Sequence, residues 1–205
     1  MDRGRQAIIG WTESAGGSAG GELEKLGRLH AAGLAVAPIM VMQASSQEDF
    51  YRYGNLVRQL SELFRGVDPA DPDEDDLDEI APAAMALVTG SYLLDEVIDE
   101  FYETVRLLPP ERRVRRPGSA GLTARGDRGS LLAVKRIWAD DWSFEALRTR
   151  LASTRSFVLE AQSVLLHAAD EPSSDPALLG RVSEVLGERC RVWVTKGGSI
   201  SRLSG

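Results

Sequence analysis

Apolar residues in the first quarter of the chain follow a strand, helix, strand order. The short run from Ala7 to Trp11 is almost wholly apolar, which predicts a buried strand. From Glu22 to Gly33 leucines recur at helical spacing, and the glycine predicts the end of that helix. Residues 36–42 are again apolar and predict a second strand. This order is typical of the start of an α/β fold.

Helical spacing dominates the middle of the chain. Ser45 and Glu48 have the spacing of a capping box, and apolar positions three and four residues apart continue to Phe64. One long helix is therefore predicted there. Another helix is expected over 93–108, and the two prolines that follow it, at 109 and 110, predict its end. The same spacing predicts two further helices, at 130–140 and 143–153.

The remaining strands are expected mostly in the second half. Residues 190–195 and 199–203 flank a Lys-Gly-Gly turn with alternating apolar positions, which predicts a hairpin. Trp138 and Trp142 lie four residues apart in a helical pattern, so both can face one side, and we expect them to pack in the core rather than to form a platform for a ligand. The other predicted elements are strands at 122–125 and 156–166 and a helix at 177–186. The expected fold is α/β, of mixed α+β type, in a single domain spanning 1–205.

Charged residues are concentrated in two segments of opposite sign. The chain has 31 acidic and 24 basic residues, but 68–79 alone hold eight acids, and 111–136 hold eight bases. Like charges repel and prolines break helices, so 67–80 is predicted to be an acidic loop and 109–121 a basic loop, both internal connectors. We expect the two segments to lie at the surface and to serve association, with each other or with a partner. Deleting 70–78 should then leave the melting temperature nearly unchanged.

Composition excludes several classes of protein. With 43% hydrophobic and 27% charged residues, the chain is typical of a globular protein rather than a disordered one. Cys190 is the only cysteine, which excludes an intramolecular disulfide and any site built from several cysteines. His30 and His167 lack metal-ligand spacing, and we predict neither a metal site nor a catalytic residue. Apolar runs are too short for a membrane span or a signal peptide, so we expect a cytoplasmic protein without membrane association.

Several stretches resemble, in order, parts of one known domain. The first, GGELEKLGRLHAAGLAVAPIMVM, is similar to GGKGxxLxxLxxAGxxVPxGFxV in that domain. The full set is 20–42, 93–108, 131–151, 156–166 and 178–203, which together hold 97 of the 205 residues. The chain thus resembles the N-terminal nucleotide-binding domain (PEP/pyruvate-binding, ATP-grasp-like) of phosphoenolpyruvate (PEP) synthase and pyruvate phosphate dikinase. The resemblance implies the N-terminal lobe of an ATP-grasp domain with a contracted C-terminal part.

The resemblance also implies cofactor-binding positions. Gly20 and Gly21 fall on the family's glycine loop, Arg125 on the arginine of its VRSSA strand, and Gln162 on the glutamine of its VAVxVQxMV strand. From the residues alone, the glycine-rich loop 16–21 could cradle a phosphate through backbone amides. It lacks the Walker and dinucleotide patterns, and a flexible connector is favoured.

Two departures from the family pattern concern the chemistry itself. Glu22 falls where the family has a lysine that meets ATP phosphates, and an acid there would repel phosphate. Val192 falls on the glutamate of the family's IEWA strand, beside the retained Trp193. Magnesium-bound ATP needs carboxylates for the metal and cations for the phosphates. We therefore expect a degenerate pseudoenzyme with no cofactor, and ATP with Mg²⁺ only if activity is retained.

Three functions follow as hypotheses. The first is a non-catalytic relative of the PEP synthase and pyruvate phosphate dikinase domain that acts as a binding or regulatory subunit, with a protein partner or as a homo-oligomer. The second is an ATP-binding, PEP synthase-like phosphotransferase lobe, as part of a split enzyme. The third is a polyanion-binding module that uses the arginines of 112–128. Nucleic-acid binding is not expected, because that segment has no aromatic residue for base stacking and the net charge is −7.

Overall fold

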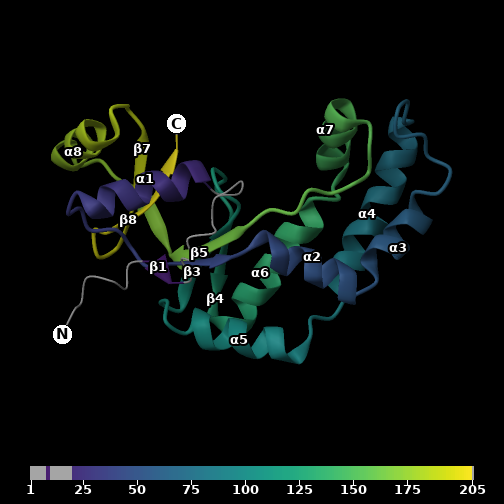
Figure 1. Cartoon of the computed structure of the whole chain (residues 1–205), viewed down its shortest axis with the longest axis horizontal. Coiled ribbons are helices and arrows are strands. Elements are labelled where there is room, and N and C mark those ends of the chain that lie inside the picture. Colours follow the sequence, from purple (N-terminus) through teal and green to yellow (C-terminus); the bar gives the residue numbers. More distant parts are fainter. Residues whose placement is uncertain (1–7, 10–19, 205) are drawn as a thin grey trace.

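A five-stranded sheet crosses the middle of the molecule, and a three-stranded sheet continues from one end of it (Figure 1). The structure, a computed structural model, describes residues 8–9 and 20–204. The larger sheet has the strand order β1-β2-β5-β3-β4 and the smaller one β6-β7-β8. The strands are β1 (Ile8–Ile9), β2 (Ile39–Met42), β3 (Glu111–Arg115), β4 (Leu122–Arg125), β5 (Val164–Ala168), β6 (Asp170–Pro172), β7 (Arg191–Thr195) and β8 (Ile200–Ser204).

Strands β2 and β5 separate two hydrophobic cores. Among the described strands, β1 and β2 pair in parallel and the other neighbours pair antiparallel. Successive side chains of a strand point to opposite faces. Ile39 and Leu165 accordingly belong to the smaller core, whereas Met40 and Leu166 belong to the larger one. The predicted mixed α/β fold is confirmed.

Helices cover both faces of this arrangement. Helices α1 (Gly20–Ala31) and α8 (Pro176–Leu186) pack together beside the smaller sheet (Figure 1). The larger core is enclosed by α2 (Ala44–Tyr53), α3 (Leu56–Leu63), α4 (Glu74–Gly90), α5 (Asp95–Val105), α6 (Gly126–Asp140) and α7 (Phe144–Thr154). Within the described ranges, no single helix is long and apolar enough to cross a membrane. Helices α4 and α5 have the required length and apolar composition only when taken together, and that pair is bent by 80°.

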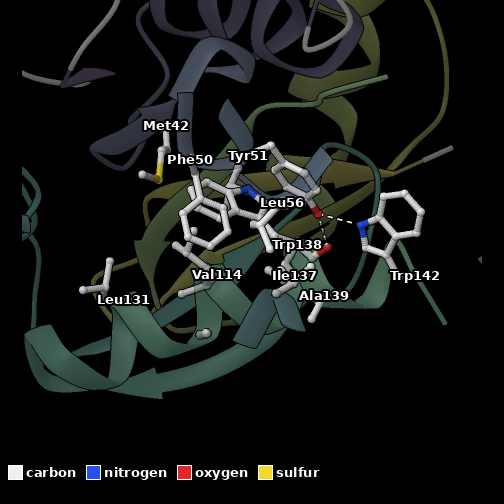
Figure 2. Packing of buried hydrophobic residues seen from close by; sticks show 14 of the residues in the cluster. Met42, Phe50, Tyr51, Leu56, Val114, Leu131, Ile137, Trp138, Ala139 and Trp142 are labelled. Carbon is white, nitrogen blue, oxygen red and sulfur yellow. Dashed lines mark hydrogen bonds between the residues drawn. The ribbon is translucent and has the colours of Figure 1, made fainter. Parts of the chain in front are cut away.

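Aromatic rings form the centre of the larger core. Trp138 is fully buried, with its ring centroid 4.9 Å from that of Phe50 (Figure 2). The Trp142 indole N–H donates to the Tyr51 hydroxyl at 2.7 Å, and that hydroxyl donates to the Trp138 carbonyl at 3.2 Å. The expectation that both tryptophans pack in the core is confirmed.

The expected acidic loop 67–80 is wrong in its second half, because α4 begins at Glu74. The Asp73 carboxylate caps the helix by accepting from the Asp75 backbone N–H at 2.9 Å, and acids in a first helical turn are favoured by the helix dipole. Leu77 is completely buried in the larger core. The deletion of 70–78 would remove this core contact and the cap, so it should not leave the melting temperature unchanged.

The expected basic loop 109–121 contains strand β3 over Glu111–Arg115. This strand lies inside the sheet, between β5 and β4. Its arginines are paired with acids from other elements, so a strand with four charged residues in five can be accommodated.

Three other expected elements differ in detail. The helix predicted from Ser45 to Phe64 is broken at Gly54 and Asn55 into α2 and α3, and its N-cap is Gln43, with no side-chain capping bond. Asn55 has a φ of 53°, in the left-handed region, which interrupts the helix. The strand predicted over 156–166 begins only at Val164, as β5. Of the strand predicted at 7–11, only β1 lies within the described residues.

Candidate functional site

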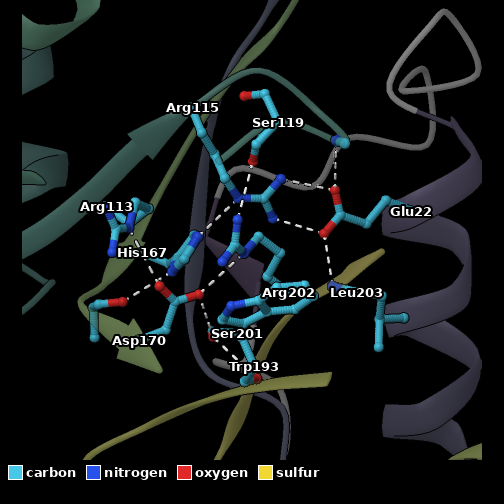
Figure 3. Close-up of polar contacts among 12 residues, drawn as sticks. Glu22, Arg113, Arg115, Ser119, His167, Asp170, Trp193, Ser201, Arg202 and Leu203 are labelled. Carbon is cyan, nitrogen blue, oxygen red and sulfur yellow. Dashed lines mark hydrogen bonds and ion pairs between the residues drawn. The ribbon is translucent and has the colours of Figure 1, made fainter. Parts of the chain in front are cut away.

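A buried ion pair connects the start of α1 to the end of β3. The Arg115 guanidinium donates through Nη1 and Nη2 to the two carboxylate oxygens of Glu22, each at 2.7 Å (Figure 3). The Arg115 side chain is 0% exposed and that of Glu22 8%. The same carboxylate accepts from the backbone N–H groups of Gly118 and Leu203, both at 3.0 Å. The Glu22 carboxylate is therefore held by four donors.

Residue 121, in the turn after β3, has to be glycine because the backbone passes close to Arg115 there. Gly121 has a φ of +68°, and a Cβ there would lie 2.2 Å from the Arg115 Cβ. Only glycine can take this conformation at that distance from a neighbouring side chain. The close approach keeps the turn against Arg115.

A second buried acid lies next to this ion pair. The Asp170 side chain is 0% exposed and accepts from Arg113 Nε at 3.3 Å and from Ser201 Oγ at 3.1 Å. Arg202 Nε forms an ion pair with it at 3.4 Å, and the Arg202 guanidinium lies 3.9 Å from the centroid of the Trp193 ring (Figure 3). These contacts connect the larger sheet to the smaller one.

His167 completes this network as a neutral imidazole. Its Nε2 accepts from Arg115 Nε at 2.9 Å, so Nδ1 carries the proton that is donated to the Ala168 carbonyl at 2.9 Å. Burial, followed by the positive charge of Arg115, lowers the pKa of His167 from 6.5 to about 4. Protonation would break the bond with Arg115 and place two cations side by side.

His167 should make the fold sensitive to mild acid. An unfolded His167 has a pKa near 6.5 and the native one about 4, so at intermediate pH the unfolded chain binds the additional proton. Stability is then lost as the pH falls, by about 2 kcal/mol between pH 7 and pH 5. Urea unfolding at pH 7, 6 and 5 measures this loss.

The matched variant is His167→Gln, whose amide oxygen can still accept from Arg115 but does not titrate. Its free energy of unfolding should change much less over this pH range. Asp141 has the opposite effect on how stability depends on pH. Burial raises the pKa of its carboxyl group, so its contribution favours the folded protein as the pH falls. An equal loss in wild type and His167→Gln would show that another group is responsible.

A separate polar cluster forms around Arg116 on the side of the helices. Arg116 Nη2 donates to the Asp141 carboxylate and to Gln47 Oε1, and Gln47 Nε2 donates to Asp141 at 2.7 Å. Gln47 Oε1 also accepts from the backbone N–H of Gln162 at 3.1 Å, and Arg116 Nη1 donates to the Gln162 carbonyl. Arg150 donates to the Asp141 carbonyl. The cluster thus joins α2, the end of α6 and the segment before β5.

This cluster borders a cleft of about 1010 Å³. Arg116 Nε and Arg150 Nη1 are buried atoms without a hydrogen-bond partner, and both residues line the cleft. Arg136 is the third cation in its lining. Four acids also line it: Asp140, Asp141, Glu145 and Glu160. The lining of the cleft thus combines guanidinium groups with carboxylates, and the cleft suits a polar ligand. No group of three or more metal-ligating side chains occurs within residues 8–9 and 20–204.

The structure separates the cofactor-binding residues that the resemblance implies. Gly20 and Gly21 begin α1, next to Glu22, and Gln162 lines the cleft. Arg125 in β4 lies opposite Glu111 in β3. The Glu111 carbonyl accepts from the backbone N–H of Ala169, which directly follows β5. Gln162 instead precedes β5, so the sheet places it and Arg125 at opposite ends. Most of the glycine-rich loop 16–21 lies outside the described residues.

Sequence reasoning missed Arg116, Asp141 and Gln47 as a cluster. They come from three elements, with contacts that span 25 to 94 positions. No local motif marks such a contact. Arg116 was considered only as one of several surface arginines, and Gln47 lies inside a predicted helix without a distinguishing neighbour.

Comparison with the models of known protein families and with characterised proteins gave no match to this chain. The likeness to the PEP synthase and pyruvate phosphate dikinase domain therefore depends on the five segments quoted above.

Proposed function

We propose that the chain is a non-catalytic relative of the nucleotide-binding domain of PEP synthase and pyruvate phosphate dikinase, and that it works as a binding or regulatory subunit. The geometry of Glu22 is the observation that carries this proposal. A guanidinium and two backbone N–H groups are the donors that would bind a phosphate, and here they hold the protein's own carboxylate. A nucleotide phosphate at this place would have to displace a buried, fully bonded anion.

Val192 supports the same reading. It stands where the family has a glutamate, and its side chain is buried in the smaller core. A metal ion could not find an oxygen ligand there. The chain thus lacks at two positions what magnesium-bound ATP requires.

The positions of the arginines favour one of the two alternative functions over the other. The cleft beside Gln162, whose lining includes Arg116, Arg136 and Arg150, is the feature that favours an ATP-binding phosphotransferase lobe, with Mg²⁺, as part of a split enzyme. The polyanion hypothesis is less favoured, because Arg112, Arg113, Arg115 and Arg116 are largely buried and paired with acids of the same chain. A cytoplasmic location and a protein partner or second copy remain part of the proposal.

The proposal predicts no turnover of ATP. Purified protein with ATP and Mg²⁺ should release no phosphate, and transfer none to pyruvate, above the rate without protein. Calorimetric titration with ATP and Mg²⁺ should show no saturable heat. The reason is that the Glu22 carboxylate already uses the donors that a phosphate needs.

Arg125→Ala is the informative variant, and Arg128→Ala is its matched control. Both arginines are exposed, and Arg128 lies one turn further along, in α6. Steady turnover that is lost in Arg125→Ala but kept in Arg128→Ala would contradict the proposal and favour the phosphotransferase. A neighbouring gene for a dikinase-like catalytic lobe would then assign the chain to a split enzyme.

A further inference from the structure

A second cavity, of about 570 Å³, lies between α2, α3 and the segment that follows α7. Its volume is in the range of pockets that hold small molecules. Aromatic rings form much of its wall: the Phe64 centroid is 5.7 Å from that of Trp142 and 4.5 Å from that of Phe157. Tyr51 lies beside Trp142 (Figure 2). Phe64 and Trp142 are buried by this mutual stacking, and Phe157 is partly exposed, so the wall is apolar and an apolar ligand can pack against it.

The cavity is open, and its rim is unusually apolar. Val158 and Val57 line it with 79% and 62% of their surfaces exposed. Large apolar side chains gathered at a concave place mark a binding site more often than scattered ones do. Water in such a cavity meets few polar partners, so an apolar ligand would replace it favourably.

One cation stands at this rim in a strained conformation. Arg155 lines the cavity with a φ of 51°, in the left-handed region, where glycine is the favoured residue at a helix end. Within the described residues its guanidinium makes no hydrogen bond or ion pair, and only its backbone N–H is used, by the Leu151 carbonyl. The chain therefore has a free guanidinium at a position whose backbone conformation favours glycine.

Glu48 is the one acid that lines the cavity in the part of the chain that the structure describes. Its carboxylate is exposed and would weaken, by repulsion, the binding of an anion at Arg155. Exposure to water screens this repulsion, and the free guanidinium remains the group that can form a direct ion pair.

We propose that this cavity binds a small molecule with a flat apolar body and one carboxylate, the body packed against Phe157, Val57 and Val158 and the carboxylate paired with Arg155. None of Glu22, Arg125 and Gln162 lines this cavity, so the presence or absence of ATP turnover does not bear on it.

Three probes with the same ring separate the two contributions: 2-naphthoate, 2-naphthylmethanol and 2-naphthylmethylamine. In calorimetric titrations with concentrations up to about 1 mM, the carboxylate should bind about fivefold more tightly than the alcohol, and the amine should not exceed the alcohol. Bound probe should shift the indole N–H signal of Trp142 in ¹H–¹⁵N spectra, whereas that of Trp193, in the smaller sheet, should stay in place. Trp142→Phe assigns the signal.

Two variants test the residues. Arg155→Asn removes the charge, and asparagine tolerates the left-handed conformation, so the fold should be kept while the preference for carboxylate disappears. Val158→Asp should abolish binding of the carboxylate probe, whereas Leu107→Asp, at another exposed apolar residue that does not line the cavity, should leave it unchanged. Glu48→Gln should tighten the carboxylate about twofold.

Three results would overturn the proposal. The first is the absence of both heat and a Trp142 shift with all three probes. The second is binding that Val158→Asp leaves intact, which would place the ligand elsewhere. The third is equal affinity for carboxylate and alcohol in the wild type, or a carboxylate preference that survives in Arg155→Asn.

Discussion

Glu22→Ala should lower the free energy of unfolding by about 3–5 kcal/mol, because it leaves the buried Arg115 guanidinium without its counter-charge. It also leaves the backbone N–H groups of Gly118 and Leu203 without their acceptor. Chemical denaturation at neutral pH measures the change. Glu24→Ala is the matched control, since Glu24 is exposed in the same helix and should change stability by less than about 0.5 kcal/mol.

A double substitution distinguishes the cost of the broken pair from the value of the intact one. Glu22→Met with Arg115→Met removes both charges, and apolar replacements of buried ion pairs are often neutral or stabilising. The double variant should therefore recover much of the stability that Glu22→Ala loses. A loss below about 1 kcal/mol in Glu22→Ala, within the range of a solvent-exposed pair, would mean that water reaches Arg115 and that the pair is not buried in solution.

Leu77→Ala should cost about 2–5 kcal/mol, the usual range for truncating a fully buried leucine in a well-packed core. Asp78→Asn is its control, because the neighbouring Asp78 is exposed and lies beyond the first turn of α4. It should change stability by less than about 0.5 kcal/mol. Thermal and urea unfolding of both variants give the comparison. Equal, small effects of the two substitutions would mean that Leu77 is not buried and that the segment is a solvated loop, as its composition predicts.

The periodic parts of the fold were predictable and the charged parts were not. The helix beginning near Glu22 and the C-terminal hairpin were predicted from local spacing, and the structure has both, as α1 and β7–β8. Helix α4 was missed because the like charges and the prolines of 67–80 predict a loop over its first turns. Its acids occupy a favourable first turn, and the carbonyl that Pro82 cannot bond belongs to the exposed Asp78, where water can reach it.

Strand β3 was missed for a different reason. A segment with arginines at four of six positions from 111 to 116 predicts a solvated loop when it is considered alone. The acids that allow burial of these arginines are supplied by other elements, such as Glu22, 93 positions before Arg115. For the same reason, the acidic residue at position 22 was visible in the sequence, whereas the partners that hold its carboxylate were not.

The contact between α1 and the last strand also sets an order of events during synthesis. Glu22 and the Leu203 backbone are 181 positions apart, which at ribosomal rates corresponds to about 9–36 s. Leu23, Leu26 and Leu29 have no complete core to enter until β8 is made. The larger core, assembled from residues 40–166, can close earlier. A nascent chain therefore presents the leucine face of α1 to solvent while its other half is already folded, and that face is where a chaperone would be expected to bind.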